Sequence, residues 1–215
     1  MNRRFLRLGL AVALAWALPS HATLIINGDF EAGNTGFSSE YAFGSLQAGA
    51  TFYNILTDPS SSHNQATSYG DHTTGAGLMM AMNGCCEPAV SPIPIVWTQS
   101  VAVDPDTDYL FSMFVSSWFP ALPAVLEVST AELGSIGTVT APSVAGLWRG
   151  FQAALNSGAN SILTLQIVDT FVLTGGAGND FALDDISLVK VPEPTTVTLL
   201  ALGLISLAFA HRRRV

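Results

Sequence analysis

Few residues of this chain are of the types that could do chemistry, and their spacing matches no common catalytic motif. His63 and His72 are the histidines that lie between the two ends of the chain, and both fall in a polar stretch. Neither the Gly-x-Ser-x-Gly motif nor the His-Glu-x-x-His motif occurs. No spacing of carboxylates identifies the acid and the base of a glycosidase. We therefore predict no catalytic residues and a protein that is not an enzyme.

The two cysteines, Cys85 and Cys86, are adjacent. In an oxidising compartment they can form a vicinal disulfide, link to another chain, or stay as two thiols. Asn83 and Gly84 before the pair and Pro88 after it suit the tight loop that a vicinal ring needs. A zinc site is excluded, because the Cys-x-x-Cys spacing and a second pair of ligands are both missing.

A sugar-binding site would need exposed aromatic faces, since the CH groups of a pyranose stack on Trp or Tyr. Trp118 is one candidate, because it ends an expected strand beside Phe119 and Pro120. Tyr53 and Tyr69 are two more, because they lie near expected loops. The alternative for Trp118 is packing in the core or at a strand edge.

The charges of the chain are unevenly placed. Between Ala22 and Lys190 there are two basic and fifteen acidic side chains, which leaves a formal charge of −13. A region so poor in cations cannot neutralise phosphates, so we predict no binding to nucleic acid. Divalent cations and neutral polymers remain possible partners.

The elements that must position these residues are short strands. Val, Thr, Ile and Phe are common and strong helix formers are scarce, which favours an all-β domain. Period-two patterns predict eight strands and hence a β-sandwich. They cover residues 24–26, 77–82, 96–103, 109–118, 124–128, 148–154, 161–169 and 181–189. Residues 60–75 are polar and without a period, so we expect a long surface loop there.

Residues 1–22 have the pattern of a secretory signal peptide. Arg3, Arg4 and Arg7 precede an apolar run from Leu8 to Leu18. The small residues Ser20 and Ala22 then occupy positions −3 and −1 of a cleavage site. We expect cleavage after Ala22, which makes residues 23–190 the folded domain.

Residues 191–215 form a second targeting segment. Pro192-Glu193-Pro194 is followed by an apolar stretch, 195–210, and then by Arg212, Arg213 and Arg214. As a helix, this stretch would rise about 24 Å, a little less than the bilayer core. We predict a transmembrane helix over 195–210, with the arginines in the cytoplasm.

The tail resembles the PEP-CTERM sorting signal, in its Pro-Glu-Pro, its apolar helix and its terminal arginines. The resemblance implies an exosortase as partner and removal of the tail near Pro192-Glu193-Pro194. It also implies a Gram-negative host that makes exopolysaccharide, with this protein at the cell surface or in the matrix. The alternative is a plain single-span anchor.

The domain resembles the jelly-roll of carbohydrate-binding modules and galactose-binding-like domains. The motifs that carry the resemblance are 24–31 (Leu-Ile-Ile-Asn-Gly-Asp-Phe-Glu), 97–99 (Trp-Thr-Gln), 109–112 (Tyr-Leu-Phe-Ser) and 181–188 (Phe-Ala-Leu-Asp-Asp-Ile-Ser-Leu). In this fold Trp97 and Trp148 are expected in the core. Fold alone does not give function.

The same resemblance implies a structural Ca²⁺ held by Asp29, Glu31 and Asp184, because related modules often place a cation between these motifs. Carboxylate oxygens suit Ca²⁺, and like charges brought close need a cation between them. Alternation places Asp184 on the inward side of its strand with Ile186 and Leu188. The alternative is that Asp184 caps backbone amides without a metal.

Together these features predict an exported, non-catalytic protein of the surface or matrix that associates with exopolysaccharide. A purely structural surface protein without a sugar site is the main alternative. A glycoside-active enzyme is a third.

Overall fold

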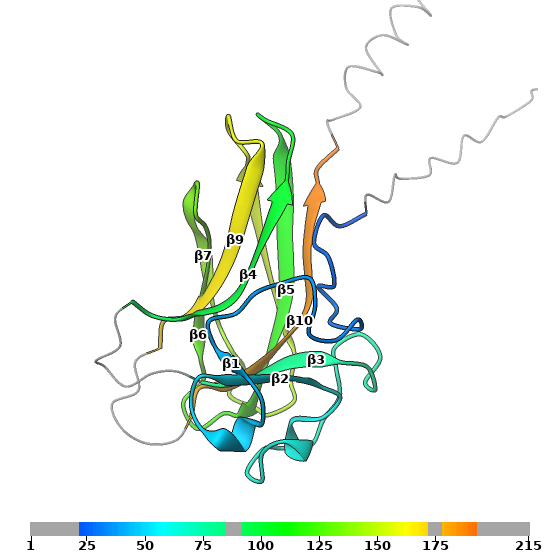
Figure 1. Cartoon of the computed structure of the whole chain (residues 1–215), viewed down its shortest axis with the longest axis vertical. Helices are drawn as coiled ribbons and strands as arrows, with labels where there is room; N and C mark the ends of the chain where they lie inside the picture. Colours follow the sequence, from blue (N-terminus) through cyan, green and yellow to red (C-terminus); the bar gives the residue numbers. More distant parts are fainter. Residues whose placement is uncertain (1–21, 85–91, 172–177, 193–215) are drawn as a thin grey trace, which may run out of the picture.

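The computed structural model describes residues 22–84, 92–171 and 178–192, and within them the chain forms two β-sheets. Figure 1 shows the long strands standing side by side, with the short β1, β2 and β3 at one end. The six-stranded sheet consists, in order, of β1 (Ala42–Phe43), β2 (Phe52–Leu56), β3 (Met79–Asn83), β10 (Asp180–Lys190), β5 (Asp108–Phe119) and β8 (Arg149–Asn156). The four-stranded sheet consists of β4 (Ile95–Ala102), β9 (Ile162–Asp169), β6 (Val125–Thr130) and β7 (Gly134–Thr140).

The two sheets enclose one apolar core, which confirms the predicted β-sandwich. In β5, Phe111, Met113 and Val115 are fully buried, while the alternate residues Ser112 and Phe114 are half-buried on the opposite side. The four-stranded sheet contributes its own alternate positions to the same cluster, among them Trp97, Leu165 and Ile167. The period of two in the sequence therefore identified the core face of these strands.

A second, smaller cluster lies on the outer face of the six-stranded sheet, meaning the face turned away from the four-stranded sheet. Trp118 and Met79 are fully buried in it, under Leu46 of the short 3₁₀ helix η1 (Leu46–Ala48). A second 3₁₀ helix, η2 (Pro59–Ser61), follows β2. Residues 62–75 form a loop, as predicted, but part of it packs on the sheet, because the His63 and Trp118 ring centroids lie 5.1 Å apart and Asp71 is buried.

The predicted strand at 24–26 is wrong, although this segment does lie along β10. Leu24 donates its amide to the carbonyl of Leu188 at 2.8 Å. The Gln99 side chain takes the place of a further strand partner: its Oε1 accepts from the Ile26 amide at 2.8 Å and its Nε2 donates to the Ile26 carbonyl at 2.9 Å. A side chain thus satisfies the backbone that a strand ladder would otherwise pair.

Candidate functional site

The candidate site lies on the outer face of the six-stranded sheet, where β5, β8 and β10 run side by side. Phe114 of β5 is paired with Gly150 of β8 and with Asp184 of β10. The next residue of β5 that faces outward is Ser112, which is paired with Gln152 of β8; the Gln152 side chain is exposed. A groove of about 300 Å³ lies over the β5 and β8 positions, lined by Ser112, Met113, Phe114, Gly150, Phe151 and Gln152.

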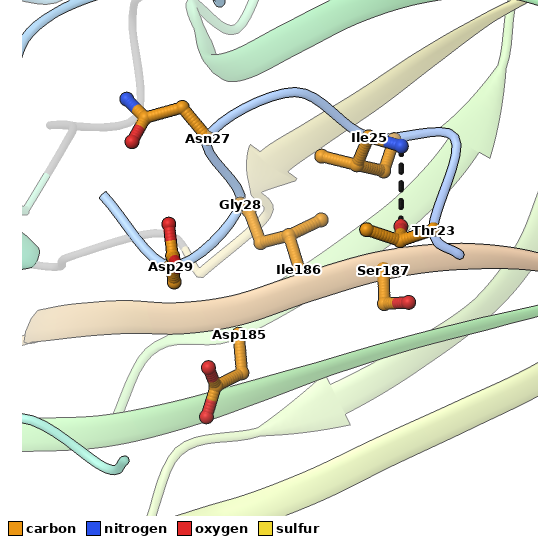
Figure 2. A pocket seen from close by; sticks show the side chains of 8 residues that line it. All are labelled: Thr23, Ile25, Asn27, Gly28, Asp29, Asp185, Ile186 and Ser187. Atoms are coloured by element: carbon orange, nitrogen blue, oxygen red, sulfur yellow. Dashed lines mark hydrogen bonds between the residues drawn. The ribbon is translucent and has the colours of Figure 1, made fainter. Parts of the chain in front are cut away.

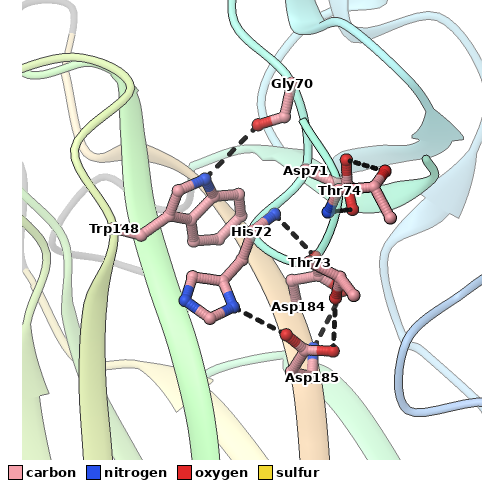
Figure 3. Close-up of polar contacts among 8 residues, drawn as sticks. All are labelled: Gly70, Asp71, His72, Thr73, Thr74, Trp148, Asp184 and Asp185. Atoms are coloured by element: carbon pink, nitrogen blue, oxygen red, sulfur yellow. Dashed lines mark hydrogen bonds and ion pairs between the residues drawn. The ribbon is translucent and has the colours of Figure 1, made fainter. Parts of the chain in front are cut away.

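The polar loop after η2 folds over one end of this face. The His72 ring stacks on the Phe114 ring with centroids 3.4 Å apart and an angle of 16°. Trp148 presents its ring at 73° to His72, with centroids 5.9 Å apart, and donates its indole N–H to the Gly70 carbonyl at 3.3 Å. Figure 3 shows the loop and Trp148 meeting above β10. This end of the face is therefore aromatic and held in place by hydrogen bonds.

Two adjacent carboxylates hold the loop from below. Asp184 accepts the His72 amide at 2.8 Å, and Asp185 accepts from Nδ1 of the same histidine at 2.6 Å. Thr73 donates its hydroxyl to the second oxygen of Asp185 at 2.7 Å. Burial raises the pKa of Asp184 to about 7, against the effect of the His72 amide, which lowers it. The loop is thus fixed to β10 through both acids (Figure 3).

A β-bulge explains how two consecutive residues can face the same loop. The register of β10 against β5 shifts between Asp184 and Ser187, and Asp185 has a φ of 50°. Bulges re-aim side chains in this way. The bulge also corrects a prediction: Asp184 lies on the outer face, opposite Ile186 and Leu188, which are in the core. Asp184 is nevertheless fully buried, because the loop covers it.

The structure describes all three predicted calcium residues. Asp29 is exposed and borders a cleft of about 270 Å³ between the N-terminal segment and the β10 bulge (Figure 2). Glu31 accepts the amide of Leu78 at 2.7 Å, and Asp184 accepts amides as described. Among the described residues, no group of three or more His, Cys, Asp or Glu side chains could hold a metal ion. Calcium at these three residues stays a prediction from the resemblance.

The Asn-Gly-Asp-Phe-Glu motif has structural roles in this arrangement. The Asn27 side chain donates to the carbonyls of Gly33 and Thr35 and accepts the Ala32 amide, which closes the loop on itself. The Phe30 side chain is fully buried in the main core. The motif thus closes the first loop of the domain and anchors it in the main core.

Asp71 is a buried acid that the sequence analysis did not single out. Its carboxylate accepts the amides of Thr74 and Gly77 at 2.8 and 2.7 Å and the Thr74 hydroxyl at 3.0 Å. Burial works to raise the pKa of Asp71, but these hydrogen bonds outweigh it and hold the pKa below its usual value. The Asp-x-x-Thr spacing is the local signal that could have identified this turn.

The predicted aromatic platforms are not exposed. Trp118 is fully buried and donates its indole N–H to the Met82 carbonyl at 2.9 Å, so it cannot stack on a sugar. Tyr53 is buried, with its hydroxyl bonded to Asn34 at 2.8 Å. Tyr69 is half-buried against Trp148, with its hydroxyl bonded to Ser116. Trp97 is in the core as expected, whereas Trp148 is half-buried on the outer face instead.

Several predictions fall on residues outside the described part of the chain. These are the signal peptide over 1–21, Cys85 and Cys86, and the tail beyond Pro192. No helix within the described residues has the length and the apolar character that a membrane span requires.

A comparison with protein families identifies the tail. The model of the PEP-CTERM protein-sorting motif matches residues 190–214. The chain carries a PEP-CTERM sorting motif. This confirms the prediction made from Pro192-Glu193-Pro194 and the arginines at 212–214. The PEP-CTERM motif marks proteins exported to the surface or the extracellular space of Gram-negative bacteria, and it is the signal that an exosortase recognises. No curated protein matches the chain.

Two solved structures have a fold similar to that of this chain. The CBM22-1 xylan-binding domain of Xyn10C from Paenibacillus barcinonensis has a TM-score of 0.51 and 14% identity, over 83% of this chain and 100% of its own. An arabinose-bound α-L-arabinofuranosidase has a TM-score of 0.50 and 14% identity, over 79% of this chain and 26% of its own. At such identity the similarity shows the fold, which agrees with the predicted jelly-roll of carbohydrate-binding modules.

Proposed function

We propose that this exported PEP-CTERM protein is a non-catalytic component of the cell surface or matrix that associates with exopolysaccharide through the groove on its outer face. The observation that carries the proposal is the composition of this face. Half-buried Phe114 lines the groove beside polar groups of Ser112 and Gln152, and half-buried Trp148 stands at 73° to His72, which stacks on Phe114. Rings that accept the CH face of a sugar, next to hydrogen-bonding groups for its hydroxyls, are what carbohydrate recognition requires.

The electrostatics of the domain support a polymer that carries no negative charge. The two cations of the domain bond elsewhere: Arg149 donates to the Thr140 carbonyl at 2.6 Å, and Lys190 pairs with Asp104 at 2.8 Å. Neither lines the groove. A polyanionic glycan would therefore meet a strongly acidic domain with no cation at the groove.

The similarity between the fold of this chain and that of a xylan-binding domain adds support for sugar association. The hydrogen bonds of Asp184 and Asp185 support a non-catalytic role, because the carboxylates near the groove already hold the loop. A structural surface protein without a sugar site, or a glycoside-active enzyme, would give different results in the test below.

The test is a glycan array and titration calorimetry on the exported protein purified from the cell surface, with exopolysaccharide from the same cells. We expect Trp148→Ala and Gln152→Ala each to weaken binding by about tenfold or more, equivalent to about 1.4 kcal/mol. Phe43→Ala, at an exposed ring on β1, and Gln166→Ala, on the solvent side of β9, are the matched controls and should bind as the unmodified protein does. Absence of binding to every glycan would favour the structural alternative, and release of sugar fragments would favour the enzyme.

A further inference from the structure

The last strand of the sandwich leads directly into the sorting motif. β10 ends at Lys190, which is paired with Tyr109, and Val191 still donates its amide to the Asp108 carbonyl at 2.9 Å. The match to the motif begins at residue 190. The sorting signal therefore starts inside the folded domain, and Pro192 follows without a linker.

The same end of β10 is also bonded on its other side, to the N-terminal segment. The Thr23 hydroxyl accepts the Leu188 amide at 3.1 Å, and Leu24 donates to the Leu188 carbonyl at 2.8 Å. The Lys190 ammonium adds an exposed ion pair with Asp104 at 2.8 Å. The residues that precede the sorting motif are thus held by β5 on one side and by the start of the domain on the other.

Chain length fixes which end of the domain lies nearest the membrane. Only residues 191–194 separate Lys190 from the apolar stretch 195–210, and this connection spans at most roughly 18 Å when fully extended. Asp180, at the other end of β10, lies about 33 Å further along the strand. In Figure 1, β10 leaves the sandwich at the end that carries the β4–β5 turn and the β8–β9 turn. With the apolar stretch in the membrane, these two turns face it.

We infer that the end of the sandwich formed by the turns at 104–107 and 157–160 is the surface that the exosortase meets, and that removal of the tail requires the end of β10 to open. An enzyme that processes a peptide chain takes it in extended, unpaired form, and its rate follows the population of the locally open state. Here the bonds at Leu188, Lys190 and Val191 resist that opening. This inference does not depend on the proposed binding of polysaccharide.

The first test inserts six residues, Gly-Ser-Gly-Ser-Gly-Ser, between Val191 and Pro192 of the full chain in a strain that has an exosortase. The rate of tail removal is followed by pulse-chase labelling and by mass spectrometry of the C-terminus. We expect removal to become several-fold faster, because the enzyme then reaches the motif without opening β10. The control places the same insert between Gly49 and Ala50, at the opposite end of the sandwich. Equal rates for the native chain and the Val191 insert would overturn the inference, and so would an equal acceleration by the control.

The second test changes the bonds at the end of β10 without changing the motif. Thr23→Ala removes the hydroxyl that accepts the Leu188 amide, whereas Thr23→Ser keeps it. We expect the Ala variant to lose its tail faster than the Ser variant. Equal rates for the two would show that opening of β10 does not limit processing and would overturn that part of the inference.

Discussion

Asp184 is fully buried beneath the loop that follows η2, and its carboxylate accepts two backbone amides, from His72 and Asp185, both at 2.8 Å. An Asn side chain offers one oxygen in place of two, so one of these amides would lose its partner. A calcium site at this residue would lead to a different expectation. Removing the charge would then abolish stabilisation by the cation and would leave the metal-free protein no worse.

The amide contacts lead us to expect that Asp184→Asn lowers the free energy of unfolding by about 1–3 kcal/mol, equally in EDTA and in excess Ca²⁺. Thermal and urea unfolding of the unmodified and variant proteins measure this, with exposed Asp106→Asn as control. A rise in melting temperature of the unmodified protein with Ca²⁺, lost in the variant, would contradict this expectation. It would establish the cation predicted at Asp29, Glu31 and Asp184.

Individual aromatic residues show where prediction from the sequence reached its limit. Alternation places Phe114, Ser116 and Trp118 on the same side of β5, and this is correct. It does not say which part of that side a distant segment will cover. η1 and the loop after η2 bury Trp118 but leave Trp148 partly exposed, and these contacts join residues far apart in the chain. Hence the fold was predictable, whereas the aromatic members of the groove were not.

At the scale of elements, the contact between the N-terminal segment and β10 depends on one glycine. A Cβ atom on Gly28 would lie 1.9 Å from the Ile186 carbonyl oxygen. The two residues are also hydrogen-bonded, because the Ile186 amide donates to the Gly28 carbonyl at 2.9 Å. Neither backbone can move away without breaking this bond. The Asn-Gly-Asp-Phe motif therefore needs glycine for close approach.

We expect Gly28→Ala to reduce the free energy of unfolding by more than about 3 kcal/mol or to prevent folding. Gly33→Ala is the matched control, because its Cβ would meet open space and only the positive φ of 75° opposes it. That control should cost about 1–2 kcal/mol. Urea unfolding of both variants measures the difference. Similar losses for the two would mean that the close approach at Gly28 does not govern stability.

Seven of the strands predicted from period-two patterns correspond to β3, β4, β5, β6, β8, β9 and β10, and each places at least one side chain in the main core. The strands that were not predicted lack this pattern. β7 contains Gly134 and Gly137 and is mostly exposed. β2 sends Tyr53 to the main core and Leu56 to the second cluster, so apolar residues occupy both of its faces. A period of two reveals a strand most clearly when one of its faces is buried and the other is not.

At the scale of the whole molecule, the end of the sandwich opposite the tail contains two buried acids, one from each sheet. Asp169 ends β9 and accepts from the Asn179 side chain at 2.6 Å, while Asp180 begins β10 and accepts the Gly84 amide at 2.8 Å. Burial raises the pKa of each carboxyl to about 7, against hydrogen bonds that lower it. The folded protein therefore holds these protons more tightly than the unfolded chain, in which the pKa is near 4.

Between pH 4 and pH 7 the folded state binds more protons than the unfolded state, so its stability falls as the pH rises through this window. We expect the free energy of unfolding to be a few kcal/mol lower at pH 8 than at pH 5. Asp180→Asn keeps an oxygen for the Gly84 amide and should flatten the profile, whereas exposed Asp106→Asn should not. Urea unfolding across this pH range is the measurement. A profile that rises from pH 5 to pH 8 in the unmodified protein would contradict the assignment.

The position of β10 also determines how the molecule responds to mechanical load. β10 lies between β3 and β5 inside the six-stranded sheet, and the tail continues from its end. While the tail anchors the protein, drag on the domain pulls along the axis of this strand and shears its hydrogen bonds together. Strands loaded in shear resist force better than hairpins that open one bond at a time, and forced unfolding is governed by the barrier to that rupture. The tether is thus attached to a strand whose hydrogen bonds to both neighbours are loaded in shear.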